Sequence, residues 1–242
     1  MHIKIWFKHK NLIGQDGFRF ALYISQIIMI IFFDTETTGL YPGQICQLSY
    51  IMQTKEDVKA KNFFFSVDYV EPSALAVHGF SVQKLKELSL GRKFSFFFEE
   101  IYQDFEKADL ICAHNTNFDF SFMRKEYERL NETFYIKNEF CSMKKSTPIC
   151  KLPRKSGVGY KYPKLSELCE YVGITDLEIS NQVCSLFGTN SSFHDARFDT
   201  SALYLAVNKC IQLGYFRDLN EYLWLELKHT HTQVEVGVHY AN

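Results

Sequence analysis

The sequence has few of the features that mark specialised classes of protein. Only five prolines and 12 glycines occur in 242 residues, which excludes a collagen-like or low-complexity chain. The seven cysteines are odd in number and form no Cys-x-x-Cys pair. We therefore expect neither a disulfide framework nor a zinc module, and a reducing, cytoplasmic location. The longest apolar run, over 20–33, is interrupted by Ser25 and Gln26 and is too short for a membrane span.

The chain also lacks an excess of charge of either sign. Its 27 basic and 28 acidic residues leave a formal charge of −1, so any surface for nucleic acid must be a local patch. The composition, 46% hydrophobic and 23% charged, is that of a folded globular protein. With 23 phenylalanines and 14 tyrosines we expect a bulky, aromatic core in one main domain.

Hydrophobic periodicity predicts the secondary structure. The apolar run over 27–34 predicts a central strand that is buried on both faces, and 45–53 and 61–69 predict two strands of an antiparallel meander. A helical period over 94–108 predicts an amphipathic helix. Shorter patterns predict strands at 110–113 and about 134–141, and helices at about 118–130, 165–171 and 196–210. Together they predict an α/β sandwich around a mixed sheet.

Residues 144–164 differ in composition from the rest of the chain. They contain seven basic residues, no acidic residue and three of the five prolines, so we expect a surface loop. Lys151, Arg154 and Lys155, near two tyrosines, are candidates for binding phosphate groups and bases. A loop that is merely solvated is the alternative.

The two ends of the chain are expected to be accessory. Residues 1–26 show no clean period, and Met29 stands where the central strand could begin, so we expect an extension that the core does not need. Residues 214–242 carry a helical pattern at Leu219, Leu223 and Leu227, which predicts a C-terminal helix and tail.

Two acidic residues follow the predicted central strand. Asp34 and Glu36 are two positions apart, and in an extended backbone this spacing directs both carboxylates to one face. Two carboxylates at the end of a buried strand repel each other unless a cation lies between them, and a divalent ion does this best. Ordinary turn chemistry is the alternative.

Two further acids are predicted to point toward the core. Asp119 and Asp199 each precede apolar residues at i+3 and i+4 on a predicted helix. A buried, unpaired carboxylate is costly, so a metal ion or a cationic side chain is expected beside each. His194 is predicted in the loop before the last helix, with Asp195 as the helix cap. From this loop its imidazole could take a proton from water.

Three motifs together resemble a known family. DTETTG (34–39), HNTNFD (114–119) and HDARFD (194–199) are similar in order and type to the three motifs of the DEDDh, or DnaQ-like, 3′-to-5′ exonucleases. This family includes the polymerase III proofreading subunit and ribonuclease T. The resemblance covers about 27–213 and implies a ribonuclease-H-like fold, a mixed five-stranded sheet with helices on both faces. His78 lies in a stretch similar to a loop of the family, and we expect it outside the catalytic set.

The resemblance also implies a mechanism with two divalent ions about 3.5–4 Å apart, Mg²⁺ or Mn²⁺. Asp34 would bridge both ions, and Glu36 and Asp199 would bind the ion that carries the attacking water. Asp119 would support the second ion through water, and His194 would be the general base.

The implied substrate is a single strand with a free 3′ end, DNA rather than RNA, cut to nucleoside monophosphates. Backbone groups of Thr37, Thr38 and Gly39 would hold the terminal 3′-hydroxyl group. A DNA polymerase is a possible partner. The alternatives are an RNA-trimming exoribonuclease of the same family, a ribonuclease-H-type endonuclease, and a non-catalytic nucleic-acid-binding or polymerase accessory module.

Overall fold

The computed structural model describes residues 28–219 and 222, so the predicted extension over 1–26 and most of the predicted C-terminal helix and tail lie outside the described residues. Five strands form one sheet in the order β3-β2-β1-β4-β5. The strands are β1 (Ile30–Thr37), β2 (Ile45–Gln53), β3 (Val58–Phe64), β4 (Leu110–Ala113) and β5 (Glu139–Cys141). The β1–β2 and β2–β3 pairs are antiparallel, and β1–β4 and β4–β5 are parallel. The predicted mixed sheet is confirmed.

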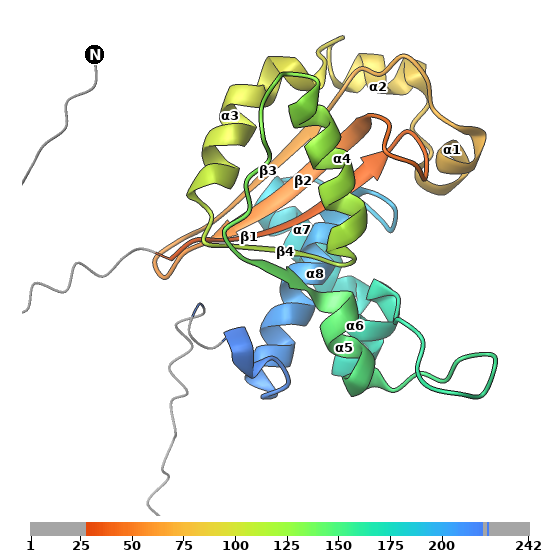
Figure 1. Ribbon diagram of the computed structural model, residues 1–242, viewed down its shortest axis with the longest axis vertical. Helices are drawn as coiled ribbons and strands as arrows, with labels where there is room; N and C mark the ends of the chain where they lie inside the picture. The colour runs from red at the N-terminus through yellow and green to blue at the C-terminus, as the bar shows by residue number, and fades with distance from the viewer. Residues whose placement is uncertain (1–27, 220–221, 223–242) are drawn as a thin grey trace, which may run out of the picture.

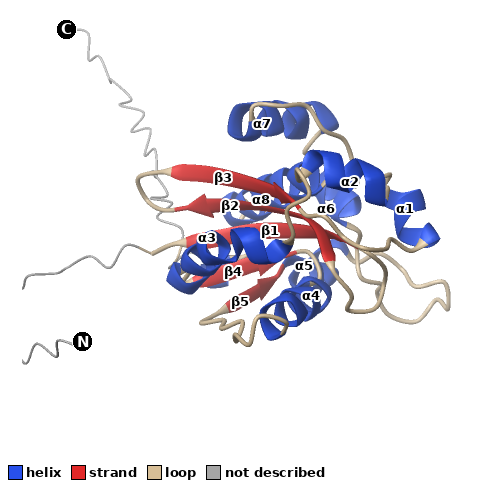
Figure 2. Cartoon of the chain, turned by 90° about the horizontal axis from the view of Figure 1, so that it is seen from above, coloured by secondary structure: helices blue, strands red, loops and turns tan. Residues whose placement is uncertain are grey.

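Helices cover both faces of this sheet (Figures 1 and 2). Those in the described residues are α1 (Pro72–His78), α2 (Val82–Leu88), α3 (Phe94–Lys107), α4 (Thr116–Glu128), α5 (Ser142–Cys150), α6 (Leu165–Val172), α7 (Asp176–Phe187) and α8 (Ala196–Gln212). Helices α3 and α4 pack on one face, whereas α8 lies across β1 and β2 on the other and is flanked by α6 and α7.

The side chains of β1 alternate between two cores because successive residues of a strand point to opposite faces. Ile30 and Phe32 join the core under α8, and Ile31 and Phe33 join the core under α3 and α4. The second core is strongly aromatic, as the composition predicts; Phe33, for example, stacks on a phenylalanine of α4 at 5.8 Å between ring centroids. The same alternation directs the acids that follow toward α8.

Several predicted boundaries were wrong. The meander strand expected over 61–69 occupies Val58–Phe64, because the backbone leaves the sheet after Phe64 while the next phenylalanine still reaches the core. The loop expected over 144–164 begins only after Cys150, since α5 includes residues 144–150 and tolerates Pro148 inside it. The strand expected over 134–141 is reduced to Glu139–Cys141.

The short helices α1 and α2 and the longer α7 were not predicted. Only one residue of α1 and one of α2 are buried, so neither helix shows a clear apolar stripe. Among the described residues the C-terminal helical pattern is represented by a single 3₁₀ turn, Arg217–Leu219. Six of the seven cysteines are buried, and Cys184 is exposed. Within the described part of the chain, no helix combines the length and the apolar character that crossing a membrane requires.

A buried glutamine on β2 holds the beginning of α8 against the sheet. The Oε1 atom of Gln47 accepts a hydrogen bond from the backbone N–H of Ala196 at 3.1 Å. Its Nε2 group donates to Asp195 Oδ1 at 3.0 Å and to Asn62 Oδ1 at 2.8 Å. Thr200, one turn into α8, donates to a β2 carbonyl at 3.1 Å. Because Gln47 is fully buried, no water can replace it in these contacts.

We expect Gln47→Leu to lower the free energy of unfolding by about 2–3 kcal/mol, because it leaves a buried N–H group and a buried carboxylate without their partner. Urea denaturation of the two proteins measures this change. Gln83→Leu is the matched control. Gln83 is exposed on α2, where its side chain donates a hydrogen bond to its helix neighbour Glu87. Its replacement should change the free energy of unfolding by less than about 0.5 kcal/mol. Equal stability of the two variants would contradict the role of Gln47.

Candidate functional site

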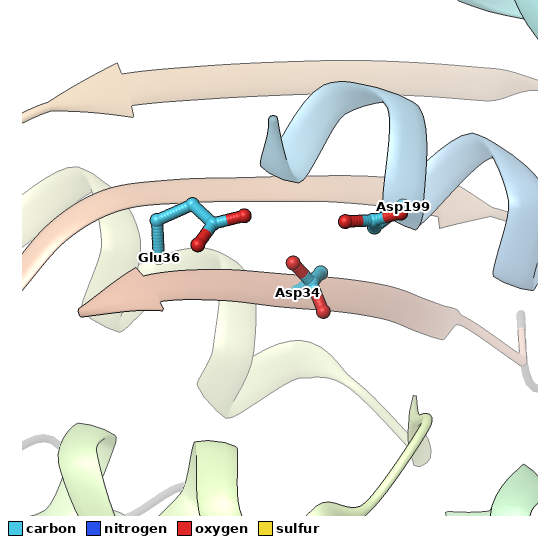
Figure 3. A group of neighbouring side chains, drawn as sticks. All are labelled: Asp34, Glu36 and Asp199. Atoms are coloured by element: carbon cyan, nitrogen blue, oxygen red, sulfur yellow. The ribbon is translucent and has the colours of Figure 1, made fainter. Parts of the chain in front are cut away.

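Three carboxylates converge between β1 and α8. Asp34 and Glu36 lie two residues apart on β1 and share the face toward α8, and Asp199 lies in the first turn of α8. One oxygen from each side chain lies within 4.8 Å of the others. Figure 3 shows the three side chains pointing toward one another in the space between the strand and the helix. The spacing of the two acids on an extended strand therefore has the predicted effect.

This position is unfavourable for three negative charges. Burial raises the pKa of Asp34 well above its usual value, and the carboxylates of Asp199, Asp119 and Glu36 raise it further. Burial, followed by repulsion from Asp199, raises the pKa of Glu36 to about 8. Burial also raises the pKa of Asp199 to about 7, although a backbone N–H group opposes this change. Each acid makes its neighbours harder to ionise.

The residues present fit a hard divalent cation. No lysine or arginine among the described residues forms an ion pair with any of the three acids, so no side chain neutralises them. The available donors are carboxylate oxygens, the ligands preferred by Mg²⁺ and Mn²⁺. The group can therefore bind a metal ion.

Asp119 approaches from the other side of β1. It lies in the first turn of α4, is almost fully buried, and its Oδ1 accepts a hydrogen bond from Thr35 Oγ1 at 2.8 Å. Burial raises the pKa of Asp119 to about 7, while the Thr35 hydroxyl opposes this change. Asp119 is thus near enough to affect Asp34 but does not belong to the group of three.

His194 lies in the loop before α8, as the sequence predicts. Asp195 is the N-cap residue of α8, and its side chain accepts a hydrogen bond from the backbone of Arg197 at 3.0 Å. His194 has a positive φ of 63°, and its backbone N–H donates to Asp199 Oδ2 at 3.2 Å. The exposed imidazole borders a cavity of about 510 Å³ that Asp34 and Asp199 also line.

The turn after β1 contains Thr37, Thr38 and Gly39. Thr37 Oγ1 donates to the carbonyl of Gly39 at 2.9 Å, and both the amide and the hydroxyl of Thr38 bond to the backbone of Gln44. The amide of Thr38 is therefore already used within the turn. A Cβ atom at Gly39 would lie 2.4 Å from the carboxyl group of Glu71, so this turn passes close to the chain before α1.

The remaining predicted residues, Lys151, Arg154 and Lys155, lie on a projecting loop between α5 and α6 (Figure 1). Residues 151–163, which we call the basic hairpin, fold back on themselves through an isolated β-bridge between Pro153 and Tyr160. Arg154 Nε also donates to the carbonyl of Tyr160 at 2.8 Å. All three basic residues are exposed, so the hairpin offers positive charge to solvent outside the acid group.

Sequence reasoning missed two histidines that support the site. His78 was expected in a loop, but it ends α1 and is buried. Its Nδ1 accepts the N–H of Phe80 at 3.0 Å, so its Nε2–H donates to the carbonyl of Thr37 at 3.2 Å. Burial lowers the pKa of His78, which keeps the ring neutral and preserves both bonds. Its place in a Val-His-Gly sequence was the only signal, and that signal does not reveal the partner.

The second missed residue is His114, which directly follows β4. Its Nε2–H donates to the carbonyl of Pro163 at 3.0 Å, and its Nδ1 accepts a hydrogen bond from Ser142 Oγ at 2.8 Å. Burial lowers the pKa of His114 to about 4, so the ring is neutral. His114 thereby ties the end of the basic hairpin to the sheet beside the acids.

A larger cavity, of about 600 Å³, lies beyond the turn after β1. Thr38, Lys93 and Arg129 line it, and none of the three acids does. Size therefore does not identify the functional site in this molecule. The candidate functional site is the acid group with its smaller cavity.

A mixed sheet of this order, with acids on its central strand, defines the protein as an α/β protein of ribonuclease-H-like fold. The chain belongs to the exonuclease family, since the model of the RNase_T exonuclease domain matches residues 31–206. This match confirms the resemblance to the DEDDh, or DnaQ-like, exonucleases. No curated protein matches the chain.

Solved structures of exonuclease I have the same fold. A product-bound exonuclease I is 20% identical, with a TM-score of 0.62, and the match covers 81% of this chain and 46% of that one. E. coli exonuclease I in complex with a dA16 oligonucleotide is 20% identical, with a TM-score of 0.60, and the match covers 80% of this chain and 43% of that one. Exonuclease I from Methylocaldum szegediense is 18% identical, with a TM-score of 0.57, and the match covers 76% of this chain and 40% of that one. The chain spans less than half the length of these relatives.

The raised pKa values predict how pH and metal act on stability. Between about pH 5 and pH 8 the folded protein holds protons on these acids that the unfolded chain has lost. The melting temperature of the metal-free protein should therefore fall as the pH rises through this range. Mg²⁺ at about 100 times its Kd should add about 2.7 kcal/mol, or roughly 5–10 °C, and more at about pH 8 than at about pH 5, where protons compete.

Thermal denaturation followed by circular dichroism, with Mg²⁺ and with EDTA, measures these shifts. In a variant that combines Asp34→Asn with Asp199→Asn, the metal-free protein should be more stable at about pH 8 and the effect of Mg²⁺ should be lost. Asp57→Asn removes an exposed acid that pairs with Lys59 and should keep the full Mg²⁺ effect. Equal Mg²⁺ effects in all three proteins would contradict metal binding at the acid group.

Proposed function

We propose that the protein is a 3′-to-5′ exonuclease that cuts single-stranded nucleic acid, preferably DNA, into nucleoside monophosphates with two divalent ions. The observation that carries this proposal is the convergence of Asp34, Glu36 and Asp199, with no cationic side chain among the described residues to neutralise them. E. coli exonuclease I, which has the same fold, has been solved with single-stranded oligonucleotides such as dA13, dA16 and dT13, and this supports the choice of a single strand.

The acids would hold the ions in the roles that the family resemblance implies. Asp34 would contact both ions, Glu36 and Asp199 the ion that carries the attacking water, and Asp119 the second ion through water. When bound, such ions lower the pKa of a water molecule and stabilise the charge that develops on the phosphate. The Thr35 hydroxyl would keep the Asp119 side chain in place for its part in this arrangement.

His194 would act as the general base. Its side chain is exposed at the border of the cavity that contains Asp34 and Asp199, so it can reach a water molecule there. The backbone bond from His194 to Asp199 sets the distance between the base and the acid group. A positioned imidazole contributes about 10²–10⁴-fold to the rate when it accepts a proton in the transition state.

The turn after β1 and the basic hairpin would bind the two ends of the bound segment. The turn over Thr37–Gly39 would bind the terminal 3′-hydroxyl. The hydrogen bond from His78 to the Thr37 carbonyl would hold this turn in place. Lys151, Arg154 and Lys155 would contact phosphates farther from the end, where each contact adds to affinity and to salt dependence. Association with a DNA polymerase and a cytoplasmic location stay predictions.

A time course on end-labelled single-stranded DNA and RNA, with Mg²⁺ and with EDTA, tests this function. We expect mononucleotides to be released from the 3′ end of DNA faster than from RNA, with no cleavage of a circular strand and no activity in EDTA. Asp34→Asn should lower kcat by at least about 10³-fold, since it removes the carboxylate whose pKa Asp199, Asp119 and Glu36 all raise, whereas Asp57→Asn should keep the wild-type rate.

Other outcomes of the same time course would identify the alternatives. Preferred release from RNA would indicate an RNA-trimming enzyme, and cleavage of the circular strand an endonuclease. Binding of both strands without release of any product would indicate a non-catalytic module. Wild-type turnover by Asp34→Asn would reject the assignment of the acid group.

His194→Ala should lower kcat by about 10²–10⁴-fold with little change in KM, because the base acts in the transition state. It should also flatten the acid limb of the pH–rate profile between about pH 6 and pH 7, the range in which an imidazole changes charge. The profile of kcat against pH measures both effects. A profile with an unchanged acid limb would remove His194 as the base.

A further inference from the structure

The cavity beside the acid group is lined by residues from separate parts of the chain. Asp34 and Asp199 line it together with Lys164 and Leu165, at the beginning of α6, and with Phe193, in the loop before α8. Neither Glu36 nor the turn after β1 contributes to this lining. The cavity is therefore separate from the turn, the proposed 3′-terminal site.

The wall of the cavity is held by hydrogen bonds and ring contacts. His114, which also lines the cavity, fixes the carbonyl of Pro163, the residue before Lys164, at 3.0 Å. The backbone N–H of Lys164 donates to the side chain of Glu167 at 2.7 Å, which fixes the first turn of α6. The ring of Phe193 packs against Phe198 of α8 at 4.5 Å between centroids. These contacts fix the backbone at Pro163 and Lys164 and the ring of Phe193.

The chemistry of this wall is that of a nucleotide site. The ammonium group of Lys164 forms no ion pair with another described residue, whereas its neighbour Lys161 is paired with Glu167. Leu165 and the half-buried Phe193 offer apolar surface beside this positive charge. The volume of about 510 Å³ is in the range of sites that enclose small ligands, about 300–1,000 Å³. Stacking of bases on aromatic rings does not depend on base identity.

We propose that this cavity binds the nucleotide on the 5′ side of the bond to be cut, with Lys164 at its phosphate and Phe193 at its base. The inference rests on the proposed function, which puts the terminal nucleoside on the turn and the reacting phosphate at the acids. A strand held in this way would continue into the cavity. The basic hairpin ends at Pro163, directly before Lys164 in the chain. The strand would thus pass the turn, the acids, the cavity and the hairpin in that order.

Two substrates distinguish this site from the rest of the active site. The p-nitrophenyl ester of thymidine 5′-monophosphate carries a terminal nucleoside and a phosphate to be cut, but no nucleotide on the 5′ side. A single-stranded oligonucleotide carries both. The measured quantity is the ratio of kcat/KM for the oligonucleotide to kcat/KM for the ester. Lys164→Ala should lower this ratio about 10-fold, Phe193→Leu should lower it several-fold, and Lys164→Arg should restore most of it.

Lys59→Ala is the matched control, because Lys59 is an exposed lysine on β3 that pairs with Asp57, and its ratio should equal that of the wild type. An unchanged ratio in Lys164→Ala would overturn the proposal. An equal fall for both substrates would also overturn it, because Lys164 would then act at the reacting phosphate or on folding. If the wild-type protein cleaves neither substrate, the proposed function itself fails and this site fails with it.

Discussion

Repulsion between carboxylates in a space with little water is the constraint on which the structure of this site depends. Asp34, Glu36 and Asp199 lie within a few ångströms of one another, and burial raises the pKa of each. The surrounding fold must supply enough stability to hold these groups together, because none of the described contacts among them is favourable at neutral pH. A bound divalent cation turns this repulsion into attraction, so metal binding and folding are coupled at this point.

The fold provides that stability by anchoring the acids to rigid elements. Two acids continue the central strand, whose earlier residues are buried in two separate cores. The third lies at the beginning of α8, where Gln47 and Asp195 satisfy the first turn through buried hydrogen bonds. Asp119 is fixed from the opposite face by Thr35. The acids therefore cannot move apart without breaking contacts elsewhere in the core.

The same elements bring the rest of the candidate site into register. His78 and His114 are neutral because they are buried, and each donates its Nε2–H to a carbonyl that is far away in the chain. The Nδ1 atom of each ring accepts a second hydrogen bond. His78 supports the turn after β1, and His114 supports the end of the basic hairpin. These two histidines set the borders of the region between the turn and α6, in which we propose that a nucleic acid strand lies.

Hydrophobic periodicity predicted the secondary structure correctly where a segment has one continuous apolar surface. The helical period over 94–108 corresponds to α3, and the β-rich run over 45–53 corresponds to β2, because each has one continuous apolar surface to bury. The period-two spacing of Asp34 and Glu36 and the capping role of Asp195 were also correct, since both depend on neighbouring residues alone. The pattern failed for 144–150, where the three prolines of the basic segment suggested a loop although only Pro148 lies within α5.

The sequence by itself determined the types of element, the family motifs and the identity of the acids, because these are properties of short segments. Only the tertiary structure decided which acids meet: three share one side of β1, while Asp119 comes from the other. It also decided that His78 and His114 serve as internal hydrogen-bond donors and that Lys164 lines the same cavity as two of the acids. Such contacts join residues up to 165 positions apart, and no local pattern records which distant segments the chain brings together.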